Sequence, residues 1–258
     1  MKAEYELLLE FLLYGAELLT RRDAGLILLG ERETASGRRL DALLERLRHE
    51  RLLDRHGLGR RATFTITADG RQRLQPSNPS EQWDRPWDEK WRVFSFDMPS
   101  QRKKDRMLLW RALRNHRFGL LQRSVWIWPH ETEPILRGIV EANNVPECFC
   151  GFEASRVFLC DDAEIVVSAW DFEEISRRHQ MYLGHAVATP ANLKRARDFG
   201  ELARLARIER DAFAYAFSLD PLLPRRLWPR TYQGPAIIER RRELRAVLHS
   251  RLQKLAET

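Results

Sequence analysis

The stretch from Trp91 to Pro129, WRVFSFDMPSQRKKDRMLLWRALRNHRFGLLQRSVWIWP, contains the signals of a complete β-α-β unit. Residues 91–97 alternate between two faces and are rich in Val and Phe, which favours a half-buried strand ended by Pro99. Ser100 is placed to cap the following helix, and Gly119 ends it. Residues 118–128, rich in aromatic and β-branched side chains, predict a second extended segment. The helix between them has apolar residues at helical spacing: Met107, Leu109, Trp110 and Leu113.

Two further segments extend this unit into a small domain. Residues 132–144 predict a helix, and residues 148–154 predict another strand. If residues 118–128 divide into two strands, the order becomes β-α-β-β-α-β, which is the order of a ferredoxin-like domain.

The N-terminal segment has the elements of a winged helix-turn-helix. Residues 3–19 predict an amphipathic helix, Thr20 is placed to cap a second helix through residue 29, and residues 36–51 predict a third helix. Two strands at 52–55 and 61–67 then pair around the turn at 56–59. In such a fold the third helix enters the DNA major groove, and the hairpin tip lies along the phosphates.

This arrangement selects the residues that we expect to contact DNA. They lie at the start of the third helix, on its outward face and at the hairpin tip: Ser36, Arg38, Arg39, Arg46, His49, Arg60 and Arg61. A winged helix that binds protein, and a basic face that is only solvated, are the alternative interpretations.

The rest of the chain completes an expected α+β architecture. Residues 76–90 are rich in proline and lack a hydrophobic period, which indicates a linker, pinned to a neighbouring domain by Trp83 and Trp87. After a short apolar run at residues 165–167, Asp171 is placed to cap a helix. Two long helices follow at 192–217 and 236–256. We therefore expect an N-terminal winged helix-turn-helix at 1–75, a central ferredoxin-like domain at 91–160 and a C-terminal helical domain at 161–258.

Charge indicates the class of partner. The 258 residues carry a net charge of +7, which favours a polyanionic partner. Residues 131–176 are the exception, with eleven acidic residues against two basic ones. This segregation predicts separate surfaces for nucleic acid and for self-association.

Composition also predicts the compartment and the absence of cofactors. No apolar run approaches the roughly 18 residues of a membrane span, and acidic residues interrupt the leucine-rich start, so we expect a cytoplasmic protein without a membrane partner. The three cysteines, Cys148, Cys150 and Cys160, suggest neither a disulfide framework nor a metal site. We expect no cofactor.

Four stretches of the sequence resemble the PaaX family of bacterial transcriptional regulators. They are WRVFSFDMP at 91–99, RFGLLQRSVWI at 117–127, AWDF at 169–172, and LDPLLP at 219–224 with the following Trp228, Pro229 and Gly234. The resemblance implies a winged helix, a central ferredoxin-like domain similar to a CRISPR-associated endoribonuclease, and a helical C-terminal domain. It also implies a DNA-binding repressor that responds to an acyl-CoA thioester.

The leading hypothesis is therefore a homodimeric repressor of transcription, not an enzyme, that binds double-stranded DNA at two half-sites about one helical turn apart. A metal-dependent nuclease is the first alternative. In the nuclease-like relatives an Asp at the end of the first strand helps to hold a divalent metal, and Asp97 stands at that position, although a local capping role explains it equally well. A protein-binding scaffold is the second alternative.

Overall fold

The computed structural model describes residues 8–9, 19–20, 24, 37–70, 79–98, 100–143 and 149–256. The chain divides into two units. The central unit consists of Asn78–His179 and Ala216–Gln233, and the terminal unit consists of Met1–Ser77, Gln180–Tyr215 and Gly234–Thr258.

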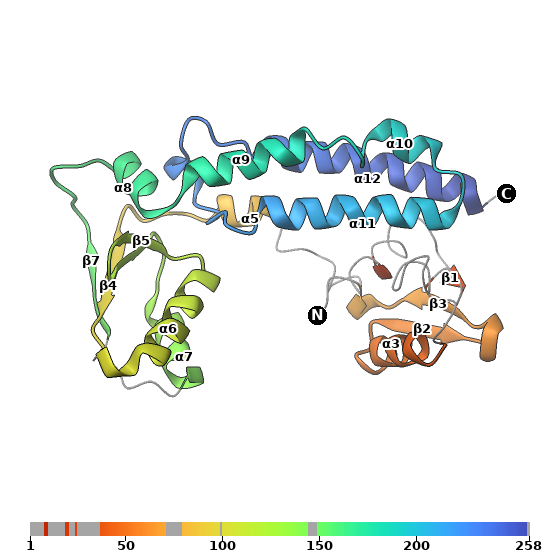
Figure 1. Ribbon diagram of the computed structural model, residues 1–258, viewed down its shortest axis with the longest axis horizontal. Coiled ribbons are helices and arrows are strands. Elements are labelled where there is room, and N and C mark those ends of the chain that lie inside the picture. The colour runs from red at the N-terminus through yellow and green to blue at the C-terminus, as the bar shows by residue number, and fades with distance from the viewer. Residues whose placement is uncertain are drawn as a thin grey trace. The chain divides into compact units, whose positions relative to one another are not determined.

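A four-stranded antiparallel sheet is the framework of the central unit (Figure 1). Its strands are β4 (Trp91–Phe96), β5 (Gly119–Gln122), β6 (Val125–Trp128) and β7 (Phe149–Ala154), in the spatial order β5-β6-β4-β7. Strand β4 is central and pairs with β6 on one side and with β7 on the other. The predicted division of residues 118–128 into two strands is confirmed, and so is the β-α-β-β-α-β order of a ferredoxin-like fold.

Helices α6 (Lys103–Asn115) and α7 (Glu133–Asn143) lie on one face of this sheet (Figure 1). Leu109, Leu113 and Ile139 join Phe94 and Trp126 in one buried aromatic and aliphatic core. The predicted cap by Ser100 is wrong, because the 3-10 turn η2 (Ser100–Arg102) precedes α6 and its N-cap position falls at Arg102.

Two tryptophans anchor the segment that precedes β4, as predicted. The Trp83 ring is buried and packs edge-on against Trp228, with ring centroids 5.2 Å apart. Trp87 Nε1 donates to the Lys90 carbonyl at 2.9 Å, and its ring lies 5.3 Å from that of Trp91. Part of the predicted linker is the short helix α5 (Pro79–Trp83).

The central unit continues with helices and a final turn. The apolar run at residues 165–167 lies in helix α8 (Asp162–Ala169), whose N-terminus has a capping box made by Asp161 and Glu164. Asp171 caps α9 (Phe172–Leu183) as predicted, because its Oδ1 accepts from Glu174 N at 2.9 Å. The 3-10 turn η3 (Arg225–Leu227) lies in the proline-rich segment before the last helix.

A three-stranded sheet and helix α3 (Gly37–His49) form the first part of the terminal unit. The strands are β1 (Leu19–Thr20), β2 (Leu53–His56) and β3 (Thr63–Ile66), in the order β1-β3-β2. The predicted third helix and hairpin are thus confirmed.

The predicted helical state of Leu19 is wrong, whereas the cap predicted at Thr20 depends on residues outside the described ones and stays a prediction. Both residues are in β1 and pair with Phe64 and Thr63 of β3. Leu19 is buried there, and a short leucine-rich run does not distinguish strand from helix by its pattern alone. Most residues of the two predicted N-terminal helices, 3–19 and 20–29, lie outside the described residues.

Three helices complete the terminal unit: α10 (Pro190–Arg195), α11 (Phe199–Ala216) and α12 (Gly234–Ala256). The single helix predicted at 192–217 is wrong, because residues 196–198 separate α10 from α11. The break is stabilised on both sides. Arg251 of α12 donates from Nε to the Ala196 carbonyl at 2.8 Å, and Asp198 Oδ1 accepts from Glu201 N at 2.9 Å. The helix predicted at 236–256 is confirmed as α12.

Within the described part of the chain, no helix is long and apolar enough to cross a membrane.

Candidate nucleic-acid interface

Helix α3 has one buried face and one exposed face. Leu40, Leu44 and Leu47 are at most 6% exposed and belong to the same hydrophobic core as Phe64 and Ile66 of β3 and the strand residue Leu53. This packing fixes the rotation of the helix about its axis. The opposite side of α3 therefore faces solvent.

Two of the candidates predicted from the sequence, Arg46 and His49, are exposed on this side of α3. Positions 38, 42, 46 and 49 follow one another at spacings of four, four and three, so they lie in one row along the helix. Arg38 and Arg39 are in the first turn, where only their backbone is described. Ala42, Arg46 and His49 are exposed, and Arg46 Nε pairs with Glu50 Oε1 at 3.0 Å.

The hairpin that follows α3 projects a loop between β2 and β3. Gly57 and Gly59 have φ values of +80° and +62°, which a non-glycine residue adopts only with strain. The turn predicted at 56–59 is longer than expected, because the 3-10 turn η1 (Gly59–Arg61) follows it. Arg60 lies in η1, and the neighbouring Arg61 is exposed. Leu58, which is 87% exposed, marks the outermost part of the loop.

A basic groove of about 720 Å³ lies along the hairpin and the end of α3. Arg48, Arg51 and Arg55 line it, together with Asp54 and Asp69. Arg48 and Arg55 both contact Glu45, at 3.0 and 3.2 Å. Residues 37–61 contain eight arginines against four acidic residues, so the helix and hairpin together are positively charged.

The structure brings the helix candidates together in α3 and the hairpin candidates together in η1, whereas Ser36 lies outside the described residues. Sequence reasoning missed Arg48, Arg51 and Arg55. Arg51 follows the helix with φ of +58°, and its carbonyl accepts from Thr67 Oγ1 at 2.6 Å. The positions of Arg51 directly before the predicted strand at 52–55 and of Arg55 at its end were a possible signal in the sequence. That both line one groove is seen only in the folded hairpin, where the chain reverses direction.

Asp97, the candidate metal ligand, is exposed directly after the end of β4. The next residue, Met98, is buried, and its carbonyl accepts from the Arg106 guanidinium. No three His, Cys, Asp or Glu side chains gather into a possible metal site within the described ranges. Asp97 is thus a single carboxylate at a strand end.

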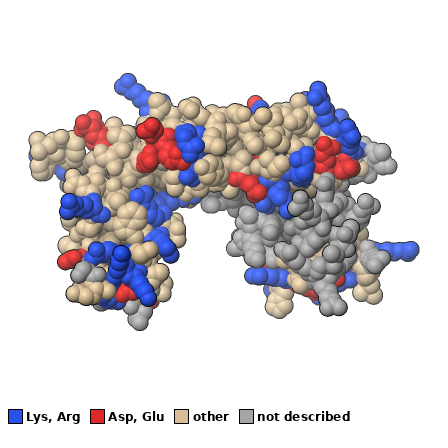
Figure 2. Space-filling view, viewed as in Figure 1, with Lys and Arg blue, Asp and Glu red and all other residues tan. Residues whose placement is uncertain are grey.

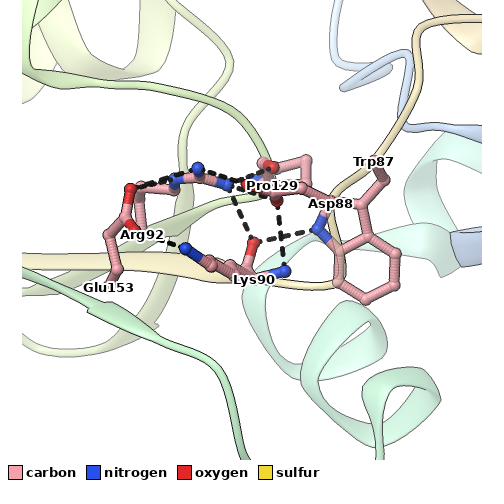
Figure 3. Close-up of polar contacts among 6 residues, drawn as sticks. All are labelled: Trp87, Asp88, Lys90, Arg92, Pro129 and Glu153. Atoms are coloured by element: carbon pink, nitrogen blue, oxygen red, sulfur yellow. Dashed lines mark hydrogen bonds and ion pairs between the residues drawn. The ribbon is translucent and has the colours of Figure 1, made fainter.

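A network of ion pairs surrounds Arg92 near the start of β4, the central strand of the sheet (Figure 3). Arg92 donates from both terminal nitrogens to Asp88, at 2.6 Å each, and from Nε to Glu153 of β7 at 3.1 Å. It also donates to the Pro129 carbonyl at 3.2 Å, so one side chain joins β4, the end of β6 and β7. Hydrogen bonding from Arg92 lowers the pKa of Asp88 to about 2.

A second polar cluster is buried in the central unit. Tyr232 donates from its hydroxyl to Asp220 Oδ2 at 2.7 Å, and His179 Nε2 lies 3.1 Å from the same oxygen. Asp220 Oδ1 accepts from Leu222 N at 2.8 Å. Burial, followed by the negative charge of Asp220, raises the pKa of Tyr232, so its hydroxyl keeps its proton and remains a donor. The cluster fastens the segment after α11 to α9.

Comparison with known proteins gives a match within the central unit. Residues 84–166 match the family described as the PaaX protein central Cas2-like domain. Among solved structures, an uncharacterized protein, Rv0674, from Mycobacterium tuberculosis is similar over 96% of this chain and 90% of its own, with 16% sequence identity and a TM-score of 0.56. At this identity the similarity concerns the fold alone. None of the curated proteins compared with the chain matches it.

Proposed function

Because residues 84–166 match the PaaX central Cas2-like domain, we propose that this chain is a PaaX-like, DNA-binding regulator of transcription. In this proposal it is a repressor without enzymatic activity, and the terminal unit binds DNA as a winged helix-turn-helix. The main support for the proposal is the row of helix positions 38, 42, 46 and 49 on α3. This row lies opposite the buried leucine face and is followed by a hairpin that carries arginines.

The two elements suit two parts of a DNA duplex. An α-helix fits the major groove, which is about 12 Å wide, so the row of Arg38, Ala42, Arg46 and His49 is suited to face base edges there. Arg60 and Arg61 on the hairpin are suited to phosphate oxygens, which position a protein on DNA but carry no sequence information. The protein's own basic groove beside the hairpin is lined by Arg48, Arg51 and Arg55. These arginines add to the positive electrostatic potential that attracts DNA.

We propose that the functional form is a homodimer assembled through the central unit. Strand β7 is an edge strand of the sheet, and Phe152 on it is 62% exposed. An exposed edge with an apolar residue favours pairing with another chain. A Phe152→Lys substitution should then shift the mass in solution from dimer to monomer, as measured by light scattering. A wild-type chain that is monomeric at all concentrations tested contradicts this part.

Regulation by a small molecule of the acyl-CoA type completes the proposal. A groove of about 600 Å³ between α7 and β7 has the size of a small-molecule site. Its lining includes Glu131, Glu133, Glu141 and Glu153, which repel the phosphates of such a ligand, against Arg92 and Arg137. We therefore expect the effector to bind outside this groove. Release of bound DNA by CoA thioesters in a gel shift tests the effector class.

A gel-shift titration tests DNA binding itself. Full-length protein is titrated against the promoter of its own operon and against unrelated duplex of equal length, at several salt concentrations. We expect sequence-selective binding that weakens steeply with salt, because phosphate contacts release counterions. Equal affinity for both duplexes, or no salt dependence, would sink the proposal.

The exposed position of Asp97 at the end of β4 keeps nuclease activity as a second candidate. Purified protein and an Asp97→Ala variant are incubated with RNA and with DNA in the presence of Mg²⁺ or Mn²⁺. Cleavage by the wild type that is lost in the variant supports a nuclease. Identical background in both proteins dismisses it.

A further inference from the structure

The outward face of α6 in the central unit carries cations and no carboxylate. Leu109 and Leu113 are fully buried, so helical periodicity places Lys103, Lys104 and Arg111 on the opposite, exposed side, with Arg114 beside them. Asp105 is the one acidic residue of α6, and it pairs with Arg102 Nε at 2.7 Å away from this face. Figure 2 shows Lys and Arg side chains concentrated over this part of the central unit.

Three cations of this face differ from the exposed arginines that pair within their own helices. Among the residues that the structure describes, Lys103, Lys104 and Arg111 have no hydrogen-bond or ion-pair partner. Some exposed arginines elsewhere pair within their own helices, as Arg137 does with Glu133 and Arg177 with Glu174. Arg114 lies over the Trp110 ring, with its guanidinium carbon 4.7 Å from the centroid. The positive charge of this face is therefore left for an external partner.

The geometry of the face suits a polyphosphate strand. From Lys103 to Arg114 the helix rises about 16 Å, at about 1.5 Å per residue. Duplex DNA carries one negative charge per roughly 1.7 Å of axis, so a segment of this length offers several phosphates to the four cations. Adjacent lysines are unusual in a protein-protein interface, where Lys is depleted. The charge pattern thus favours nucleic acid over an acidic protein.

We propose that the outward face of α6 is a second DNA contact, which binds the sugar-phosphate backbone without reading sequence. The proposal rests on the DNA-binding function above and extends it to the central unit. Met107 and Leu108, which are 48% and 44% exposed between the cations, lie at the same contact.

The test removes the three unpaired cations from the full chain. The variant Lys103→Gln, Lys104→Gln, Arg111→Gln is compared with the wild type by fluorescence anisotropy on promoter and unrelated duplexes over a salt series. We expect affinity for both duplexes to fall at least about tenfold at about 0.1 M salt, and the slope of log K against log salt to fall in magnitude by about 2 to 3. The ratio between the two duplexes should stay unchanged, since phosphate contacts do not discriminate sequences.

A matched control separates a local contact from loss of net charge. The variant Arg137→Gln, Arg177→Gln, Arg242→Gln loses the same charge from arginines that pair with Glu133, Glu174 and Glu239. We expect this control variant to keep the wild-type slope of log K against log salt. Both variants should keep the wild-type circular dichroism spectrum.

Each outcome decides one claim. If the wild type binds selectively and the α6 variant keeps its affinity and slope, the α6 contact is overturned and an acidic protein becomes the better partner. If the slope of log K against log salt falls as much in the control variant as in the α6 variant, the proposed α6 contact is also contradicted, because the loss of net charge then explains both changes in slope. A wild type without selective, salt-sensitive binding overturns the proposed function instead.

Discussion

Gly119, at the start of β5, lies where the sheet of the central unit packs against the end of α8. A Cβ atom at this position would be 2.6 Å from Cζ2 of the Trp170 ring and 2.8 Å from Ala169 Cβ. The indole cannot move freely, because Trp170 Nε1 donates to the Arg117 carbonyl at 2.9 Å. The sequence shows Gly119 only as a helix breaker, whereas the fold shows that it also leaves room for Trp170.

We predict that Gly119→Ala destabilises the protein by about 1–3 kcal/mol through overpacking. Gly138→Ala is the matched control, because Gly138 is exposed within α7 and no atom beyond the backbone of its own helix lies within 4 Å of the place that a Cβ would occupy. There the substitution should stabilise by up to about 1 kcal/mol through helix propensity. Urea unfolding measures both, and equal effects of the two substitutions contradict the packing account.

The lowered pKa of Asp88 predicts that the stability of the central unit depends on pH. Hydrogen bonds from Arg92 lower the pKa of Asp88 from 3.8 to about 2. A lowered pKa in the folded state means that the ionised carboxylate stabilises the fold above pH about 4, and that this contribution is lost as the pH falls toward 2.

Asp88→Asn should therefore lower the melting temperature near pH 7, and the difference from the wild type should shrink as the pH falls below about 4. Because Asp88 is half exposed, we expect at most about 1 kcal/mol. Thermal unfolding followed by circular dichroism between pH 7 and pH 3 measures this difference. A difference that grows on acidification is the opposite of the expected sign.

At the scale of elements, local signals in the sequence located most of the regular structure. The aromatic and β-branched residues of WRVFSF and the aromatic run before Pro129 indicated strands of the central sheet, in which β4 is buried at three positions and β6 at three consecutive positions. The leucine pattern of residues 40–47 indicated the buried face of α3. Asp171 was found as a cap because capping depends on neighbouring residues alone.

The elements that were missed depend on contacts between distant residues. β1 is a strand because Leu19 and Thr20 pair with β3, more than forty residues later. The break between α10 and α11 is held by Arg251, which reaches the Ala196 carbonyl from α12. The groove arginines were missed for the same reason, since helix end, strand and loop meet only after the chain has reversed.

The hairpin leads to a prediction at this scale. Arg61 is exposed in η1, so Arg61→Gln should leave stability unchanged within about 0.5 kcal/mol. If the hairpin lies along the phosphates, the substitution should weaken binding to all sequences alike and reduce the salt slope by about 1. Anisotropy titrations on two duplexes at several salt concentrations measure this. A change in sequence preference would instead place Arg61 at a base edge.

At the scale of the whole molecule, the chain contains a central unit that matches the PaaX central Cas2-like domain and a terminal unit with a helix and hairpin of positive charge. The uneven charge of the sequence, with residues 131–176 acidic and the flanking regions basic, predicts separate surfaces for nucleic acid and for self-association. Charge alone does not show which side chains share a face. That follows from the buried leucines of α3 and α6, which set the rotation of each helix.

The central claim is that the exposed row of α3 faces DNA, and Ala42 offers its sharpest test. Ala42 lies between Arg38 and Arg46 in that row, and a Glu there suits an exposed helix position but opposes DNA phosphates and base acceptors. Ala42→Gln controls for size, and Ala191→Glu, at an exposed position of α10, controls for charge.

The measurement is the dissociation constant of each full-length variant for promoter duplex at about 0.1 M salt. We predict that Ala42→Glu binds at least about tenfold more weakly than the wild type. Ala42→Gln and Ala191→Glu should each stay within about threefold, with unchanged melting temperatures. Wild-type affinity in the Ala42→Glu variant, or equal loss in the Ala191→Glu variant, would contradict a DNA-facing α3.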